Sequence, residues 1–119
     1  MVERRKHKRI QALIHRESIA LVRHNLQTLP ANIADLSVDG ALLQFPSTRF
    51  GFDEGSSVSV WLDSGGTLFE IQAVVIRTEP GYVAVRFSGM TRENDAEVRR
   101  KLIRMEMISS RSKTAVAVV

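Results

Sequence analysis

Two polar clusters in the sequence could bind an anionic ligand. The first contains Arg5 and Arg9, separated by three residues, within the basic run of residues 4–9. Two guanidinium groups at this spacing can converge on one phosphate, or on a phosphate and a base, because each donates paired hydrogen bonds in a fixed plane. This run therefore favours recognition of a phosphorylated ligand.

The second cluster lies further along the chain, from Asp35 to Gly40. A carboxylate such as that of Asp35 can accept hydrogen bonds from the Watson–Crick edge of guanine. Ser37 projects on the same face if the segment is extended, because side chains alternate along a strand. Gly40 allows the backbone to turn or to lie close to a ligand. We therefore predict that the two clusters are halves of one site.

Together the clusters resemble the signature of the PilZ domain. That signature is an Arg-x-x-x-Arg segment before the first strand and an Asp/Asn-x-Ser-x-x-Gly segment at a strand end. The matching segments here are Arg5-Lys6-His7-Lys8-Arg9 and Asp35-Leu36-Ser37-Val38-Asp39-Gly40. Both are complete and in the family's order, and the resemblance covers roughly residues 4–105.

The resemblance implies a receptor for cyclic di-GMP, a bacterial second messenger, and no other cofactor. Arg5 and Arg9 would grip phosphate and guanine, while Asp35 and Ser37 would read a guanine edge and Gly40 would complete the site. Arg4 could stack on an additional guanine through a cation–π contact. The number of ligand molecules bound stays open at this point.

The length of 119 residues suits one domain. The sequence has no cysteine, which excludes disulfides and thiolate metal sites and suits a reducing cytoplasm. It shows neither a signal peptide nor an apolar stretch of the ~20 residues that a membrane helix requires. We therefore expect a cytoplasmic protein without a membrane span, and the resemblance implies that it is bacterial.

The excess of positive over negative charge lies at one end of the chain. Residues 1–9 carry five Lys or Arg residues and one Glu, and so account for the whole net charge of +4. A duplex-binding protein spreads its cations along a face, whereas one basic arm before a neutral body suits a ligand with few phosphates. The alternative reading of the arm is a solvated, disordered tail.

Beyond the arm, the sequence predicts short strands separated by turns. Asp63-Ser64-Gly65-Gly66 and Glu79-Pro80-Gly81 are hairpin signals, and Pro30 predicts an edge or irregular strand. Short strands joined by sequential hairpins favour an antiparallel all-β barrel or sandwich. The resemblance implies the more specific fold, a six-stranded antiparallel PilZ-like β-barrel with a C-terminal helix over residues 10–108. The predicted strands are residues 18–22, 27–36, 41–45, 57–63, 68–77 and 82–87.

A helix is predicted to begin after Thr91, a suitable N-cap residue. Val98, Leu102 and Met105 share one face, and Ile103 and Met107 would widen it. This face would pack on the barrel or, alternatively, bind a partner helix or a second copy. The helix should end near Ile108, and residues 109–119 are predicted to form a mobile tail.

No catalytic motif is evident, so an enzyme is not expected. The sequence lacks a Gly-x-Ser-x-Gly elbow, a Walker lysine motif and a Gly-x-Gly-x-x-Gly loop. His7, His15 and His24 form no i, i+4 pair and have no cysteine partner, so a metal site is not expected either.

The favoured reading is that residues 1–9 form a flexible arm, which closes on cyclic di-GMP and signals to an unidentified partner protein. Motility, biofilm formation and polysaccharide control are candidate processes, and the oligomeric state stays open. One alternative is a small barrel that binds RNA or DNA through the arm, although Trp61 and Tyr82 are too few for a base-stacking platform. Another is a PilZ-like adaptor that acts through protein contacts without binding a nucleotide.

Overall fold

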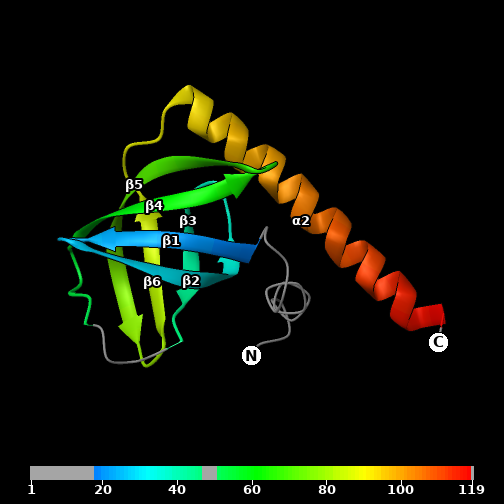
Figure 1. Ribbon diagram of the computed structural model, residues 1–119, viewed down its shortest axis with the longest axis horizontal. Coiled ribbons are helices and arrows are strands. Elements are labelled where there is room, and N and C mark those ends of the chain that lie inside the picture. Colours follow the sequence, from blue (N-terminus) through cyan, green and yellow to red (C-terminus); the bar gives the residue numbers. More distant parts are fainter. Residues whose placement is uncertain (1–17, 47–50, 119) are drawn as a thin grey trace.

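The computed structural model describes residues 18–46 and 51–118, with only the backbone described for residues 108–118. Six strands are followed by a long helix (Figure 1). The elements are β1 (Ile19–His24), β2 (Gln27–Leu36), β3 (Gly40–Gln44), β4 (Ser57–Ser64), β5 (Thr67–Glu79), β6 (Tyr82–Phe87) and α2 (Arg92–Val118).

The strands form a closed barrel in the order β1-β2-β3-β6-β5-β4, and every neighbouring pair is antiparallel. The predicted six-stranded antiparallel barrel with a C-terminal helix is therefore confirmed. Figure 1 shows α2 beginning over the barrel and extending well past it. The first part of α2 contacts β4 and β5.

Two tight turns set the register of the hairpins. Between β4 and β5, Gly65 and Gly66 have φ angles of 62° and 93°, which side chains disfavour, and the Gly66 amide donates to Asp63 Oδ1 at 2.7 Å. Between β5 and β6, Gly81 follows Pro80 with a φ of 81°. Both predicted hairpins are therefore confirmed.

The core follows from the alternation of side chains along each strand. Inward residues are aliphatic or aromatic, and complete burial of one such side chain contributes about 1.5–3 kcal/mol. Alternation along β3, β4 and β6 predicts an inward set of residues, and all of them are buried: Ala41, Leu43, Phe45, Val58, Val60, Leu62, Val83, Val85 and Phe87. The core includes Ala20, Val22, Ile33, Leu36, Ala41, Leu43, Phe45, Val58, Val60, Leu62, Ile71, Ala73, Val75, Val83, Val85, Phe87, Val98 and Met105.

Strand β2 is irregular, as predicted, but it is not an edge strand because it pairs with both β1 and β3. Pro30 lies opposite Leu21 of β1, in a part of β2 that precedes its pairing with β3. The missing amide proton of Pro30 therefore costs no hydrogen bond on that side.

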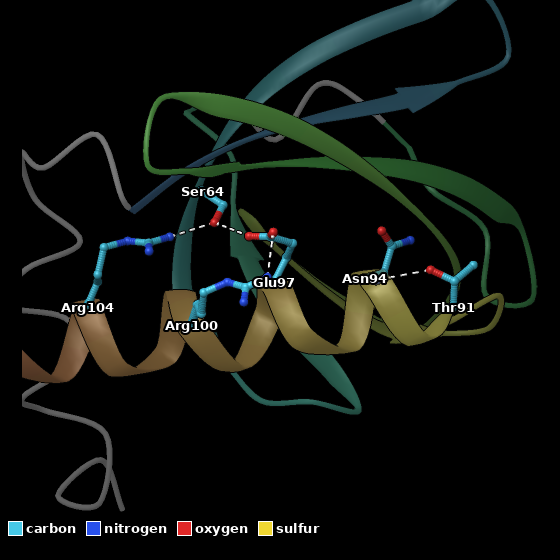
Figure 2. Close-up of polar contacts among 6 residues, drawn as sticks. All are labelled: Ser64, Thr91, Asn94, Glu97, Arg100 and Arg104. Atoms are coloured by element: carbon cyan, nitrogen blue, oxygen red, sulfur yellow. Dashed lines mark hydrogen bonds and ion pairs between the residues drawn. The ribbon is translucent and has the colours of Figure 1, made fainter.

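The start of α2 agrees with the prediction. Thr91 Oγ1 accepts a hydrogen bond from the Asn94 amide at 3.0 Å, as a helix N-cap does (Figure 2). Val98 and Met105 are buried, and Leu102 packs against the core. By contrast, Ile103 and Met107 are 60% and 51% exposed, so they do not widen the buried stripe.

Lys101 shares the buried face of α2 with Val98 and Met105. Its side chain is completely buried, and its Nζ donates to the Asp63 carbonyl oxygen at 2.6 Å. Lys101 thus faces the β4–β5 turn, and Ile103, two residues further on, lies on the opposite side of the helix. Hydrogen bonding offsets part of the cost of burying the ammonium group.

The helix also continues to Val118 instead of ending near Ile108. No glycine or proline occurs between residues 108 and 118, so the backbone meets no local signal for a helix end. The mobility of residues 109–119 stays a prediction.

A polar network joins α2 to the end of β4 (Figure 2). The Ser64 hydroxyl donates to Glu97 Oε1 at 2.6 Å and accepts from Arg104 Nη2 at 2.7 Å. Glu97 also accepts from Arg100 Nη2 at 2.8 Å. These contacts fix the helix over the β4–β5 hairpin, on a different part of the barrel from residues 35–40.

This network predicts a pH-dependent stability. The hydrogen bond from Ser64 lowers the pKa of Glu97 below its ordinary value of 4.5. Partial burial of the carboxylate raises this pKa, whereas Arg100 and Arg104 lower it further. A lowered folded-state pKa stabilises the fold above the unfolded-state pKa, and that contribution is lost as pH falls through the folded-state pKa.

We therefore expect Glu97→Gln to flatten the fall in melting temperature when pH is lowered from about 5 to about 3. Glu106→Gln, which changes an exposed carboxylate of the same helix, is the control and should follow the unmodified protein. Thermal melts in a pH series measure this. Equal pH dependence in the unmodified protein and Glu97→Gln would contradict a role for the network.

Candidate ligand-binding site

The residues from Ser37 to Asp39 form a tight connection between β2 and β3. The Ser37 amide donates to the Gly40 carbonyl oxygen at 2.9 Å, and Ser37 Oγ accepts from the Asp39 amide at 3.1 Å. The Phe87 amide donates to the Asp39 carbonyl oxygen at 2.8 Å, which ties the connection to β6. Val38 packs against the core. The motif is therefore held in one conformation by its own polar groups.

A β-bulge places Asp35 on the outside of the barrel. In a regular strand Ile33 and Asp35 would share a face, and Ile33 is completely buried in the core. The pairing of β2 with β3 shifts register between these two residues. Ala34 is the extra residue, so Asp35 turns outward while Leu36 returns to the core. The bulge thus presents a carboxylate beside the turn.

Gly40 brings β3 unusually close to β6. A methyl group at this position would overlap the Val85 carbonyl oxygen and would lie 3.1 Å from the Arg86 Cα atom. Gly40 pairs with Arg86 across the two strands. The requirement for glycine here comes from this close approach and not from an unusual φ angle.

Asp35, Ser37 and Gly40 line one open hollow of about 340 Å³ on the outside of the barrel. This volume lies within the range of about 300–1,000 Å³ that is common for small-molecule sites. The structure therefore brings together the three described residues that the sequence analysis assigned to ligand binding. The other three, Arg4, Arg5 and Arg9, lie outside the described residues.

The hollow also contains residues that the sequence analysis did not single out. Arg77 of β5 and Arg86 of β6 line it, together with Asp39. Alternation placed Arg86 on the outside, between the inward residues Val85 and Phe87, and was the available signal. Arg77 had no such signal, because its position depends on a break in the alternation of β5.

A second hollow of about 400 Å³ lies over β1, β4 and β5, and its lining includes Arg23, Trp61 and Gln72. It contains none of the predicted site residues. In the residues that the structure describes, no group of three or more His, Cys, Asp or Glu side chains could hold a metal ion. No helix in the described part of the chain is long and apolar enough to cross a membrane.

Comparison with known proteins gives a family and similar solved structures, among them two PilZ domains. The model of the PilZ domain family matches residues 3–104. The PilZ domain of CeSA from a cellulose-synthesizing bacterium has 18% identity and a TM-score of 0.62, with 74% of this chain and 91% of that chain covered. The PilZ domain of YcgR from Escherichia coli, solved with c-di-GMP, has 16% identity and a TM-score of 0.66, with 82% and 88% covered. No curated protein gives a significant match.

Proposed function

We propose that this chain, which belongs to the PilZ domain family, is a receptor that binds cyclic di-GMP without altering it. The observation that carries the proposal is the placement of Asp35, Ser37 and Gly40 around one open hollow. The YcgR domain was solved with c-di-GMP, which supports the same class of ligand here.

The chemistry of the hollow suits a guanine base. The Asp35 carboxylate can accept hydrogen bonds from guanine N1–H and N2–H at once, because it has two acceptor oxygens. Ser37 Oγ accepts from the Asp39 amide and lies 3.4 Å from the Gly40 carbonyl oxygen. A hydroxyl oxygen has two lone pairs, so one remains for a ligand, and the turn holds it in place.

The basic arm supplies the second half of the proposed site. Arg5 and Arg9 would hold phosphate and guanine against the hollow, and Arg4 could stack on a further guanine. Closure of residues 1–9 on the ligand would be the signal that a partner protein reads. Motility, biofilm formation and polysaccharide control are the processes that we propose for a cytoplasmic bacterial receptor of this kind.

Asp35→Asn tests whether this carboxylate reads guanine. The substitution keeps the size of the side chain but replaces one acceptor oxygen with a donor group. We expect cyclic di-GMP affinity to fall by about 1–3 kcal/mol with little change in melting temperature. The preference over cyclic di-AMP should narrow, because adenine carries no N1–H and no N2 amino group. Parallel calorimetric titrations with both nucleotides measure both effects.

Asp39→Asn is the matched control, because it removes the same charge from the same hollow. It should leave the guanine preference intact. An unchanged preference in Asp35→Asn would mean that Asp35 only shapes the strand. Absence of cyclic di-GMP binding by the unmodified protein would favour the adaptor that acts through protein contacts alone.

A further inference from the structure

The hollow has a second wall that neither motif contributes. Strand β6 lies between β3 and β5 in the barrel (Figure 1). The outer surface of the barrel beside Gly40 of β3 therefore continues onto β6 and then onto β5. Arg86 and Arg77 extend from this wall into the lining of the hollow. Two arginines thus face the same space as Asp35 and Ser37.

The position of Arg86 follows from strand alternation and from Gly40. Val85 and Phe87 are buried on the inner side, so Arg86 lies on the outer side, where it is exposed. Its cross-strand neighbour is Gly40, which has no side chain to cover it. The guanidinium group therefore has open space beside the turn that carries Ser37.

The position of Arg77 follows from a second bulge. The pairing of β5 with β6 shifts register between Val75 and Arg77, so Ile76 is the extra residue. Val75 is buried, whereas Ile76 and Arg77 are both exposed and both line the hollow. The bulge in β2 turns Asp35 toward the same space. Bulges commonly redirect side chains beside functional sites, and here two of them serve one hollow.

An anion can bind in the hollow only if positive side chains offset its two carboxylates, and Arg77 and Arg86 do so. Asp35 and Asp39 alone would repel a phosphate, but Arg77 and Arg86 balance them among the lining residues. Arg77 Nε lies 3.2 Å from Glu79 Oε2, and both side chains are about half exposed. Exposed ion pairs of this kind contribute little to stability. Arg77 can therefore leave Glu79 and bind an oxygen of the ligand instead.

We infer that Arg77 and Arg86 bind a phosphate of cyclic di-GMP from the barrel side of the hollow, an inference that rests on the proposed function. The ligand carries two phosphates. The wall formed by Arg77 and Arg86 would hold one of them. Arg77 and Arg86 lie on strands of the hydrogen-bonded barrel, so this wall is in place before the ligand arrives.

Arg77→Gln and Arg86→Gln test the inference in the full chain. Each variant removes a charge-assisted hydrogen bond to phosphate and should lower cyclic di-GMP affinity about tenfold or more. Melting temperatures should not change, because both side chains are exposed. The slope of log affinity against log salt should become shallower in each variant, since fewer phosphate charges are neutralised. A purely structural role would not change this slope.

Arg99→Gln is the matched control, because Arg99 is also an exposed arginine with an ion-pair partner, Asp95 Oδ2 at 2.8 Å, but lies on α2. It should bind like the unmodified protein. If the unmodified protein binds cyclic di-GMP and the Arg77 and Arg86 variants bind it equally well, these arginines do not bind a phosphate, while the proposed function stands. If the unmodified protein fails to bind, the proposed function itself is wrong and the inference falls with it.

Discussion

Replacing Arg5 or Arg9 by alanine is expected to reduce cyclic di-GMP affinity by about 1.5–3 kcal/mol, which is about ten- to a hundredfold. Each substitution removes charge-assisted hydrogen bonds to phosphate or guanine, and an alanine side chain replaces none of them. The melting temperature should stay constant, because neither residue belongs to the predicted barrel. Calorimetric titration measures the affinity, and a thermal melt checks the fold.

Lys6→Ala is the control for this pair, because it removes one positive charge from the same arm outside the Arg-x-x-x-Arg positions. If the arm attracted the ligand only through its overall positive charge, all three variants would lose the same affinity. We expect the lysine variant to lose much less. Binding of either arginine variant with the affinity of the unmodified protein would contradict the assignment of the arm to the site.

Gly40→Ala is expected to destabilise the protein by about 2–3 kcal/mol and to abolish ligand binding. The added methyl group would overlap the Val85 carbonyl oxygen, so β3 must move away from β6 or lose its register. The turn that presents Ser37 begins from this strand and would move with it. A denaturant titration measures the loss of stability, and calorimetry measures the loss of affinity.

Gly89→Ala provides the comparison, since a methyl group there would meet the Gln72 side chain at an ordinary distance of 3.4 Å. That variant should keep both stability and affinity. If Gly40→Ala were equally well tolerated, the close approach of β3 and β6 would not be a requirement of the site.

Most of the barrel could be predicted because its signals are local. The glycines at the β4–β5 turn and the Pro80-Gly81 turn fix two hairpins, and regular alternation identifies the inner residues of β4 and β6. These features depend only on residues that are close together in the sequence, so one amino-acid sequence is enough to predict them.

The two bulges could not be placed by the same reasoning, because alternation identifies a face only while its period is unbroken. In β2 the buried residues Ile33, Ala34 and Leu36 do not alternate, and that irregularity was the signal available. In β5 nothing before the structure indicated that Ile76 and Arg77 would both face outward. Arg77 was missed for this reason, whereas alternation had placed Arg86 on the outside.

The buried face of the helix differed from its prediction because it includes Lys101 and excludes Ile103 and Met107. Lysine is expected to face solvent, yet Lys101 is completely buried and its ammonium group donates to the Asp63 carbonyl oxygen. Sequence alone gives no indication that a carbonyl oxygen of the β4–β5 hairpin is available at that place. Ile103 and Met107 are exposed because helical spacing places them away from Val98 and Met105.

Amide NMR spectra of the isotope-labelled full chain, recorded during titration with cyclic di-GMP, test the central claim most directly because they report both binding and its place. We predict saturable shifts of the amide signals of Ser37, Asp39, Gly40 and Arg86. The amide signals of the basic arm should shift as well. The Trp61 indole N–H, which belongs to the second hollow, should not shift. Spectra that stay unchanged at saturating ligand, or shifts that gather around Trp61, would contradict a cyclic di-GMP site at residues 35–40.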